Sequence, residues 1–358
     1  MKKEDRLLRV GVLGCGPISQ FAHFEACRRA RNAELYAICD RAADLVDRMA
    51  VLHSPKTTYN DYDAMLADPQ VEAVVIATAD AFHVPLTKKA IAAGKHVLVE
   101  KPMGVTVEEC AELAELVKAS GLKLQVGYMK RFDPGLEFVH DFAQKELGQR
   151  LAFKSCYHDS IYRYTMTDNL QVIPMASPQA LRPEGNPKAD KRRYFMLTHG
   201  SHLVDTARYL GGEIERVNAR LVERFGAYCW YIAVDYADGS VGHLDLIVAV
   251  RGDWREDFQL EAEHGNAAGK IHLPWFHKTS EVEVFSTKDG LYRRPLGEDA
   301  HTYKRQMEGF ADTVLNGAPQ RGANVEDGAE GVRILVAISQ SVERGEPVRL
   351  ADVTGGLA

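Results

Sequence analysis

The sequence lacks any apolar run long enough to cross a membrane, and it carries no excess of positive charge. Its 358 residues include 44 lysines and arginines against 50 aspartates and glutamates, which gives a net charge of −6. Nucleic acids and anionic membranes select positively charged surfaces, so we expect neither as a partner. The basic and then apolar start of the chain is interrupted by Arg9 and supplies the first expected strand. We therefore expect no cleaved signal peptide and a cytoplasmic protein.

Cysteine is also scarce, and the six cysteines form neither a C-x-x-C pair nor a zinc-like cluster. Scattered cysteines of this kind are typical of small buried side chains in a reducing compartment. Repeats and low-complexity tracts are absent from the sequence. The length predicts two globular domains that bury enough surface to fold without disulfides.

The clearest positive signal lies near the start of the chain. An apolar run at 7–13 leads into Gly14 and Gly16, a helical pattern follows, and a second apolar run at 34–39 ends at Asp40. This order of strand, glycine turn, helix, strand and acid is that of a dinucleotide-binding unit.

Each residue of this motif has a physical reason to be there. Gly14 permits the tight turn, Gly16 lets the backbone approach a pyrophosphate at the helix N-terminus, and Asp40 can bind the adenosine ribose. The third small position of the motif is Ser19, which is still small but is neither Gly nor Ala. An ordinary glycine-rich turn between a strand and a helix is therefore the alternative interpretation.

Strand-like and helical patterns alternate as far as residue 128, which predicts a doubly wound parallel sheet. The expected strands are 7–13, 34–39, 71–78, 96–100 and 122–128, and the expected helices include 85–93 and 107–119. After a linking helix at 132–147, strand patterns follow at 150–158, 214–224, 228–237, 240–250, 256–263, 268–273 and 281–286. Turn signals at Asp238-Gly239, Gly265-Asn266 and Asp289-Gly290 predict a largely antiparallel sheet.

The predicted fold is therefore of the α/β class in two parts. A Rossmann domain with a parallel sheet is expected at 1–130, and an α/β domain with an open, mostly antiparallel sheet at 131–358. The closing helices, expected at 303–315 and 325–344, can pack back on the first domain. The proline-rich segment 163–194 is long for a connection, which favours either a lid over the substrate or a surface or oligomer arm.

Several sequence blocks together carry a resemblance to a known family. They are AGKHVLVEKP at 93–102 after Thr78 and His83, GYMKRFDP at 127–134, HGSHLVD at 199–205, RYLGG at 208–212, EDG at 326–328 and VRL at 348–350. In their order over nearly the whole chain they resemble the Gfo/Idh/MocA oxidoreductases. The resemblance implies a nucleotide domain followed by an α/β domain whose sheet face forms the substrate site and often an oligomer interface. It also implies hydride transfer between a nicotinamide and a carbon that bears a hydroxyl.

Two residues are the expected catalytic pair. Oxidation of a secondary alcohol needs a base for the hydroxyl proton and a cation for the developing alkoxide, and His202 and Lys101 suit these roles. Many family members carry an aspartate four residues before the histidine, but this position is Thr198 here. The departure puts the lysine–aspartate–histidine triad in doubt, and Thr198 or His199 could support catalysis instead.

Each of these residues also has a plainer interpretation. Lys101 could be a solvated loop lysine, and His202 could be a packed helical histidine. His199, His202 and Asp205 have the spacing to share a helical face, which makes a metal site the second alternative for His202, but no metal is expected.

The remaining candidates follow from the motif and the resemblance. Asp40 favours NAD over NADP, because its carboxylate would repel a 2′-phosphate. The expected cofactor-binding residues are Gly14, Cys15, Gly16, Pro17, Ile18, Asp40, Arg41, Thr78, Ala79, His83, Glu100 and Lys101. The substrate-binding candidates are Lys130, Arg131, Tyr157, Tyr162 and Tyr303.

We therefore predict an NAD-dependent oxidoreductase acting on a polyhydroxylated small molecule, such as a sugar, cyclitol or glycoside. A homodimer or homotetramer is expected. A non-catalytic protein that senses NAD(P) and a glycosidase that uses NAD transiently are the alternatives. The retained Lys101 and His202 argue against the first of these alternatives.

Overall fold

The structure is a computed structural model that describes residues 6–162, 170, 173–181, 183–184 and 188–357, and these residues divide into two units. The first unit comprises the described residues of Met1–Met129, Gln171–Pro187 and Thr302–Ala329. The second comprises those of Lys130–Leu170, Lys188–His301 and Glu330–Ala358. The chain thus leaves the first unit after Met129, and two later segments return to it.

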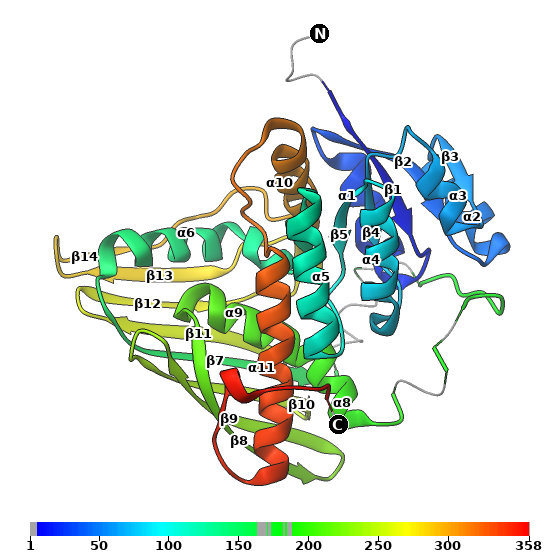
Figure 1. The fold of residues 1–358 in the computed structure, drawn as a ribbon. Helices are drawn as coiled ribbons and strands as arrows, with labels where there is room; N and C mark the ends of the chain where they lie inside the picture. The colour runs from blue at the N-terminus through cyan, green and yellow to red at the C-terminus, as the bar shows by residue number, and fades with distance from the viewer. Residues whose placement is uncertain (1–5, 163–169, 171–172, 182, 185–187, 358) are drawn as a thin grey trace. The chain divides into compact units, whose positions relative to one another are not determined.

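The first unit is built on a six-stranded parallel sheet (Figure 1), as predicted. Its strands are β1 (Leu8–Leu13), β2 (Ala33–Cys39), β3 (Thr57–Tyr59), β4 (Ala73–Ile76), β5 (His96–Val99) and β6 (Leu124–Val126). Their order across the sheet is β3-β2-β1-β4-β5-β6, which is the doubly wound arrangement with its reversal between β1 and β4. Every residue of β4 is buried, as expected of a strand covered on both faces.

Helices pack against this sheet, and the local sequence defines where α5, for example, begins and ends. They are α1 (Phe24–Arg29), α2 (Ala43–His53), α3 (Tyr62–Ala67), α4 (His83–Ala92), α5 (Val107–Ser120) and α10 (Thr302–Asn316). At the start of α5, Thr106 and Glu109 form a reciprocal capping box, and Gly121 ends the helix with a φ of 70°. α4 packs against β4 and β5, while α1 and α2 pack against β2.

The second unit is built on a nine-stranded sheet that is antiparallel except where β7 meets β10. Its strands are β7 (Arg150–Ser160), β8 (Ile214–Arg224), β9 (Ala227–Tyr236), β10 (Val241–Val250), β11 (Arg255–Ala262), β12 (Gly265–Lys270), β13 (Glu281–Ser286), β14 (Leu291–Arg293) and β15 (Val348–Arg349). The order across the sheet is β14-β13-β12-β11-β7-β10-β9-β8-β15. The predicted fold class is confirmed in both units.

The helices of the second unit are α6 (Pro134–Phe142), α8 (Lys191–Phe195), α9 (Ser201–Gly211) and the larger part of α11 (Val325–Arg344). α9 packs on β7 and β10, and α6 packs on β13 (Figure 1). At the start of α6 the side chain of Asp133 accepts hydrogen bonds from the backbone N–H groups of Gly135 and Leu136. No helix in the described ranges is long and apolar enough to cross a membrane.

One predicted turn is wrong. Gly265-Asn266 was expected to be a turn, with the next strand at 268–273, but the turn is Glu263-His264 and β12 already begins at Gly265. Gly265 has a φ of 145°, and a Cβ there would lie 1.9 Å from the carbonyl oxygen of Phe285 on β13. The glycine is required by the close approach of the neighbouring strand, which the sequence pattern does not reveal.

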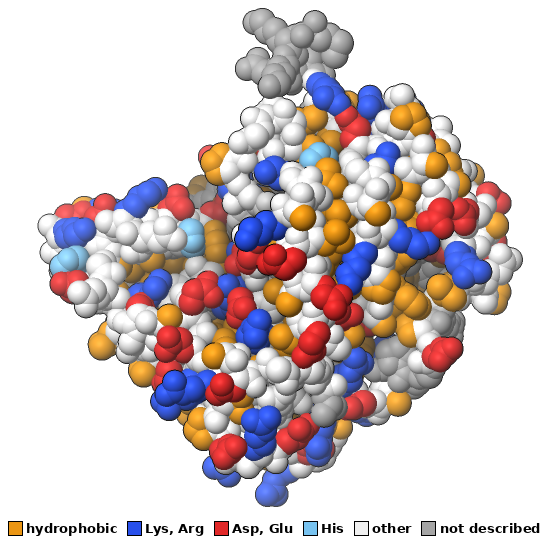
Figure 2. Space-filling model, viewed as in Figure 1, with side chains coloured by type: hydrophobic (Ala, Val, Ile, Leu, Met, Phe, Trp, Pro, Cys, Tyr) orange, Lys and Arg blue, Asp and Glu red, His pale blue; other side chains and the backbone are white. Residues whose placement is uncertain are grey.

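Charged side chains of both signs are interspersed over the face drawn in Figure 2. On this face the blue and red side chains form no continuous patch of one sign.

Candidate functional site

The glycine turn after β1 has the geometry that its sequence predicts. Gly14 has a φ of 97°, and a Cβ on it would lie 2.6 Å from the carbonyl oxygen of Ala77. At Gly16 a Cβ would meet nothing within 4 Å, so the space beside this part of the backbone is open. The turn leads into a π-helical turn, Ser19–His23, in which Ser19 is fully buried. A small residue is therefore required at position 19, and serine meets that requirement.

A cleft of about 570 Å³ opens at this turn, within the first unit. This volume is in the usual range for a small-molecule site. The lining residues are Leu13, Gly14, Gly16, Pro17, Ile18, Asp40, Arg41, Leu45, Tyr62, Ala77, Thr78, Ala79, Phe82, Leu86, Ala180 and Leu181. Eight of the twelve predicted cofactor residues are among them: Gly14, Gly16, Pro17, Ile18, Asp40, Arg41, Thr78 and Ala79. The other eight were not predicted: Leu13, Leu45, Tyr62, Ala77, Phe82, Leu86, Ala180 and Leu181.

Asp40 directly follows β2, and two backbone N–H groups hold its carboxylate in place. Its Oδ2 accepts a hydrogen bond from the N–H of Cys15 at 2.8 Å, and its Oδ1 accepts one from the N–H of Ala42 at 2.9 Å. Each carboxylate oxygen has a further lone pair, so both can still accept a hydrogen bond from a ribose hydroxyl. The glycine cradle, the open space at Gly16 and this oriented carboxylate together fit a dinucleotide cofactor.

Two of the predicted cofactor residues have structural contacts instead of a place in the cleft lining. The thiol of Cys15 is fully buried, and burial, with a further contribution from the charge of Asp40, raises its pKa far above the ordinary value. A thiol in this state stays protonated and unreactive. The ring of His83 lies between two carbonyl oxygens, with Nδ1 2.7 Å from that of Pro102 and Nε2 3.1 Å from that of Thr78. His83 thereby connects the end of β4 to the Lys101-Pro102 turn.

Glu100 and Lys101 follow β5, at the same edge of the parallel sheet as the glycine turn. Glu100 is buried, its Oε1 lies 2.8 Å from Nε2 of His23, and its Oε2 accepts the backbone N–H of Lys101. Burial raises the pKa of Glu100, but the hydrogen bond and charge of His23 and the charge of Lys101 outweigh it, so the pKa lies below its ordinary value. Tyr303, predicted to bind substrate, lies edge-on to the His23 ring with 5.7 Å between centroids.

His202 lies on α9 in the second unit, and its ring is stacked on that of Tyr157 from β7. The two planes differ by 6° and the centroids are 6.1 Å apart. Trp254 meets the Tyr157 ring edge-on, at 6.1 Å between centroids. Tyr157, a predicted substrate residue, is buried and therefore orients His202 through ring contact.

His199 forms an unpredicted pair with Asp159, the penultimate residue of β7. Nε2 of His199 lies 2.9 Å from Oδ2 of Asp159, and both side chains are buried. The hydroxyl of Thr198 donates to the carbonyl oxygen of Tyr194 at 2.6 Å and also lies 2.8 Å from Nδ1 of His199. Since the hydroxyl hydrogen of Thr198 is used for the Tyr194 carbonyl, its oxygen can only accept from Nδ1–H. Both ring nitrogens of His199 therefore have a partner, Thr198 at Nδ1 and Asp159 at Nε2.

Lys130 and Arg131 are committed to buried ion pairs in the second unit. Lys130 pairs with Glu256 of β11 and lies over the Tyr157 ring, 4.7 Å from its centroid. Arg131 donates to Asp205 of α9 from Nε at 3.0 Å and from Nη2 at 2.7 Å. Burial lowers the pKa of Lys130 and raises that of Glu256, while the pair contact opposes both shifts. The charged group of each of these two predicted substrate residues is therefore held in a buried ion pair within the second unit.

The other site predictions are placed as follows. Tyr162 lies in the turn directly after β7, and its side chain is more than half exposed. Asp205 is occupied by Arg131, and in the ranges that the structure covers no three His, Cys, Asp or Glu side chains converge as metal ligands. Of segment 163–194, residues 163–169, 171–172, 182 and 185–187 lie outside the described residues, whereas 173–181 belong to the first unit.

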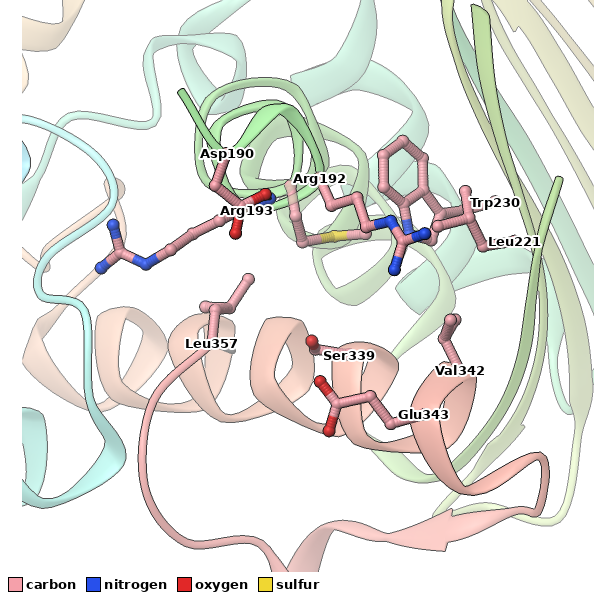
Figure 3. A pocket seen from close by; sticks show the side chains of 10 residues that line it. Asp190, Arg192, Arg193, Leu221, Trp230, Ser339, Val342, Glu343 and Leu357 are labelled. Carbon is pink, nitrogen blue, oxygen red and sulfur yellow. The ribbon is translucent and has the colours of Figure 1, made fainter. Parts of the chain in front are cut away.

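A second cavity, of about 160 Å³, lies in the second unit between α8 and α11 (Figure 3). Asp190, Arg192 and Glu343 are among the side chains around it. Arg192 already pairs with Glu223, and none of the residues predicted to bind cofactor or substrate lines this cavity.

Comparisons with known proteins agree with the geometry. A family model described as an oxidoreductase family with an NAD-binding Rossmann fold matches residues 8–128, and the model of that family's C-terminal alpha/beta domain matches 195–350. The chain is 25% identical to inositol 2-dehydrogenase 2 of Saccharopolyspora erythraea, over 96% of each chain. It is 24% identical to D-xylose 1-dehydrogenase (NADP(+)) 2 of Haloferax volcanii, over 95% of this chain and 97% of that one.

Among solved structures, the chain is similar to an oxidoreductase from Agrobacterium radiobacter in complex with NAD+, L-tartaric acid and magnesium. The TM-score is 0.78 at 16% identity, and the match covers 96% of this chain and 98% of that one. This likeness supports the fold.

The Glu100 contacts predict a pH-dependent contribution to stability. Because the folded-state pKa of Glu100 lies below its ordinary value of 4.5, the ionised carboxylate stabilises the fold above that pH. The contribution is lost as the pH falls through the folded-state pKa. Glu100→Gln should therefore lower the free energy of unfolding at pH 7, and the difference from wild type should shrink below about pH 4.

Urea unfolding between pH 3 and 8 measures this difference, with Glu115→Gln at an exposed position of α5 as the control. A deficit that is constant across this range would contradict the assignment.

Proposed function

The chain belongs to the Gfo/Idh/MocA oxidoreductases, and we propose that it transfers a hydride between NAD and a secondary hydroxyl or keto carbon of a sugar, cyclitol or glycoside. The family membership makes it an NAD(P)-dependent dehydrogenase. The observation that carries the proposal is the cleft at the carboxyl ends of β1, β2 and β4, with its glycine cradle and the oriented carboxylate of Asp40. Relatives named as inositol and xylose dehydrogenases support the polyhydroxylated substrate class.

The two units have different roles in this proposal. The first, which we equate with the Rossmann domain predicted at 1–130, holds the cofactor. The second, equated with the domain predicted at 131–358, supplies the substrate-binding surface and the contacts of a homodimer or homotetramer. Its sheet supports the latter role, because exposed apolar side chains, Val222, Tyr231 and Val241, stand on neighbouring strands.

The proposed mechanism gives one role to each of two residues: one removes a proton, and the other stabilises a negative charge. Bound NAD supplies the hydride acceptor. His202 removes the hydroxyl proton, so that the alcohol becomes a carbonyl as the hydride leaves its carbon. The ammonium group of Lys101 stabilises the negative charge that develops on the oxygen. Tyr157 keeps the His202 ring in one orientation through their stacking.

The acid that is missing at position 198 has a replacement in this proposal. Asp159 carries a carboxylate on β7, and His199 holds it at 2.9 Å. His199 also meets the Tyr157 ring edge-on, with 5.6 Å between centroids, so the pair and His202 share one aromatic neighbour. We assign Asp159 and His199 as positioning residues that act on catalysis through Tyr157 and His202.

The first prediction from the proposed function concerns the catalytic pair. Lys101→Ala and His202→Ala should each lower kcat roughly a hundredfold or more, the usual scale for a positioned proton-transfer group. NAD affinity should stay nearly unchanged. NADH fluorescence against a panel of sugars, inositols and glycosides identifies the substrate and then measures kcat. Lys118→Ala, on the exposed face of α5, is the matched control. A fully active His202→Ala enzyme would overturn the mechanism.

Cofactor selection generates the second prediction. The Asp40 carboxylate should repel a 2′-phosphate, so NAD(H) should bind at least tenfold more tightly than NADP(H), which corresponds to about 1.4 kcal/mol. Asp40→Ser should relax this preference, because serine removes the charge but still offers a hydroxyl. Fluorescence titrations of both reduced cofactors give the ratio. Equal affinities of the wild-type protein would refute the assignment.

The third prediction tests the Asp159–His199 pair. Asp159→Asn should lower kcat, and the acid limb of the pH–rate profile should move, because the charge beside His199 is lost. Thr198→Asp in the wild type places a second carboxylate next to His199, and we expect it to abolish activity. The same change in the Asp159→Asn protein should recover part of the activity. If Asp159→Asn changes only thermal stability and leaves the pH profile in place, the pair is purely structural.

A further inference from the structure

We propose that Ile173–Leu181 is a wall of the cofactor site that retains the adenosine half of the dinucleotide, with Gln20 and Ser177 as its positioning residues. The inference rests on the proposed cofactor binding and goes beyond the glycine motif, because no part of that motif lies in 173–181. Ala180 and Leu181 line the same cleft as Gly14 and Asp40. A segment 140 to 167 residues further along the chain therefore contributes to the nucleotide site.

Gln20 ties this segment to the glycine turn itself. It lies in the π-helical turn directly after the motif and is 8% exposed. Its Nε2 donates to the carbonyl oxygens of Cys15 at 2.8 Å and of Met175 at 2.9 Å, and its Oε1 accepts the N–H of Met175 at 2.9 Å. The side-chain amide of Gln20 therefore binds both the backbone N–H and the backbone carbonyl of Met175, as a neighbouring strand would. It also binds the glycine turn that would hold the pyrophosphate.

Ser177 provides a second, separate anchor. It is 4% exposed, and its hydroxyl donates to Oδ1 of Asp44 in the first turn of α2 at 2.6 Å. The same oxygen accepts the N–H of Gln179 at 3.0 Å, which fixes the turn that leads to Ala180. The segment is thus fastened to the helical turn after β1 and to the helix after β2, which are the two elements that flank the adenosine side of a Rossmann site.

The exposed side chain of Leu181 indicates which part of the cofactor the wall contacts. Its side chain is 56% exposed although it lines a cleft whose other walls include Leu45, Tyr62 and Phe82. An apolar side chain left open beside an apolar cleft gains by being covered, and an adenine or ribose ring offers such a cover. Asp40 and Arg41 line this cleft too, which places the contact at the ribose and adenine end of the cofactor.

The wall predicts slow cofactor release that depends on its anchors. Gln20→Leu removes three hydrogen bonds at nearly constant volume, and Ser177→Ala removes the second anchor without touching the glycine turn. Each variant should raise the NADH dissociation rate about tenfold, which equals about 1.4 kcal/mol. Leu181→Ala should weaken ADP-ribose and NAD by the same factor and leave nicotinamide mononucleotide unchanged. Gln70→Leu, at an exposed position of the first unit outside this segment and outside the cleft lining, is the matched control and should match wild type.

Two measurements decide the matter without any assay of turnover. Stopped-flow displacement of NADH gives the dissociation rates, and hydrogen exchange of peptides covering 173–181 should slow when NAD saturates the wild-type protein. If Ser177→Ala and Leu181→Ala release NADH at the wild-type rate, or if NAD leaves the exchange of 173–181 unchanged, the wall is refuted while cofactor binding stands. If the wild-type protein binds neither NAD nor ADP-ribose, the proposed function itself fails.

Discussion

The contact on which the site depends is the close approach of the Gly14 turn to the two neighbouring strands. The N–H of Gly14 donates to the carbonyl oxygen of Cys39 at 2.8 Å, and the N–H of Ala77 donates to that of Leu13 at 2.9 Å. There is no space for a side chain at position 14, since a Cβ would lie 2.6 Å from the Ala77 oxygen. Because the carboxyl ends of β1, β2 and β4 are held together in this way, the residues that follow them necessarily surround one cleft.

The grouping of the residues around the glycine turn was predictable because it is local in sequence. A strand, a glycine turn and an acid at the end of the next strand have only one arrangement once the strands are parallel. Gly14, Asp40 and Thr78 accordingly line one cleft, and their contact with the cofactor stays a prediction. Leu181 was not predictable. Its place depends on a segment that leaves the second unit and returns to the first, and no periodicity in the sequence signals that return.

In the second unit, the chemical type of a residue was a poorer guide to its contacts than its position in the fold. Lys130 and Arg131 have the chemistry to bind hydroxyl groups, but both are 7% exposed and paired with Glu256 and Asp205. Those partners lie 126 and 74 residues further along the chain, beyond the reach of any local pattern. Removing one member of such a pair leaves an uncompensated buried charge, so each pair fixes the position of the strand or helix that carries it. A positive charge next to a predicted site can therefore be committed to an ion pair within the fold.

The candidate sites of the two units differ in how they can change. The cofactor cradle consists largely of backbone and depends on a few positions where a glycine or an acid is required, so most other substitutions leave it intact. The surroundings of His202 consist of side chains from β7, β11 and α9, and each substitution there alters shape or charge directly. Position 198 illustrates this difference, because its carboxylate is absent while Asp159 on another element faces the adjacent histidine. A charge that is needed at a point in space can be supplied from any element that reaches it. The substrate side can therefore be rebuilt while the backbone that binds the cofactor stays the same.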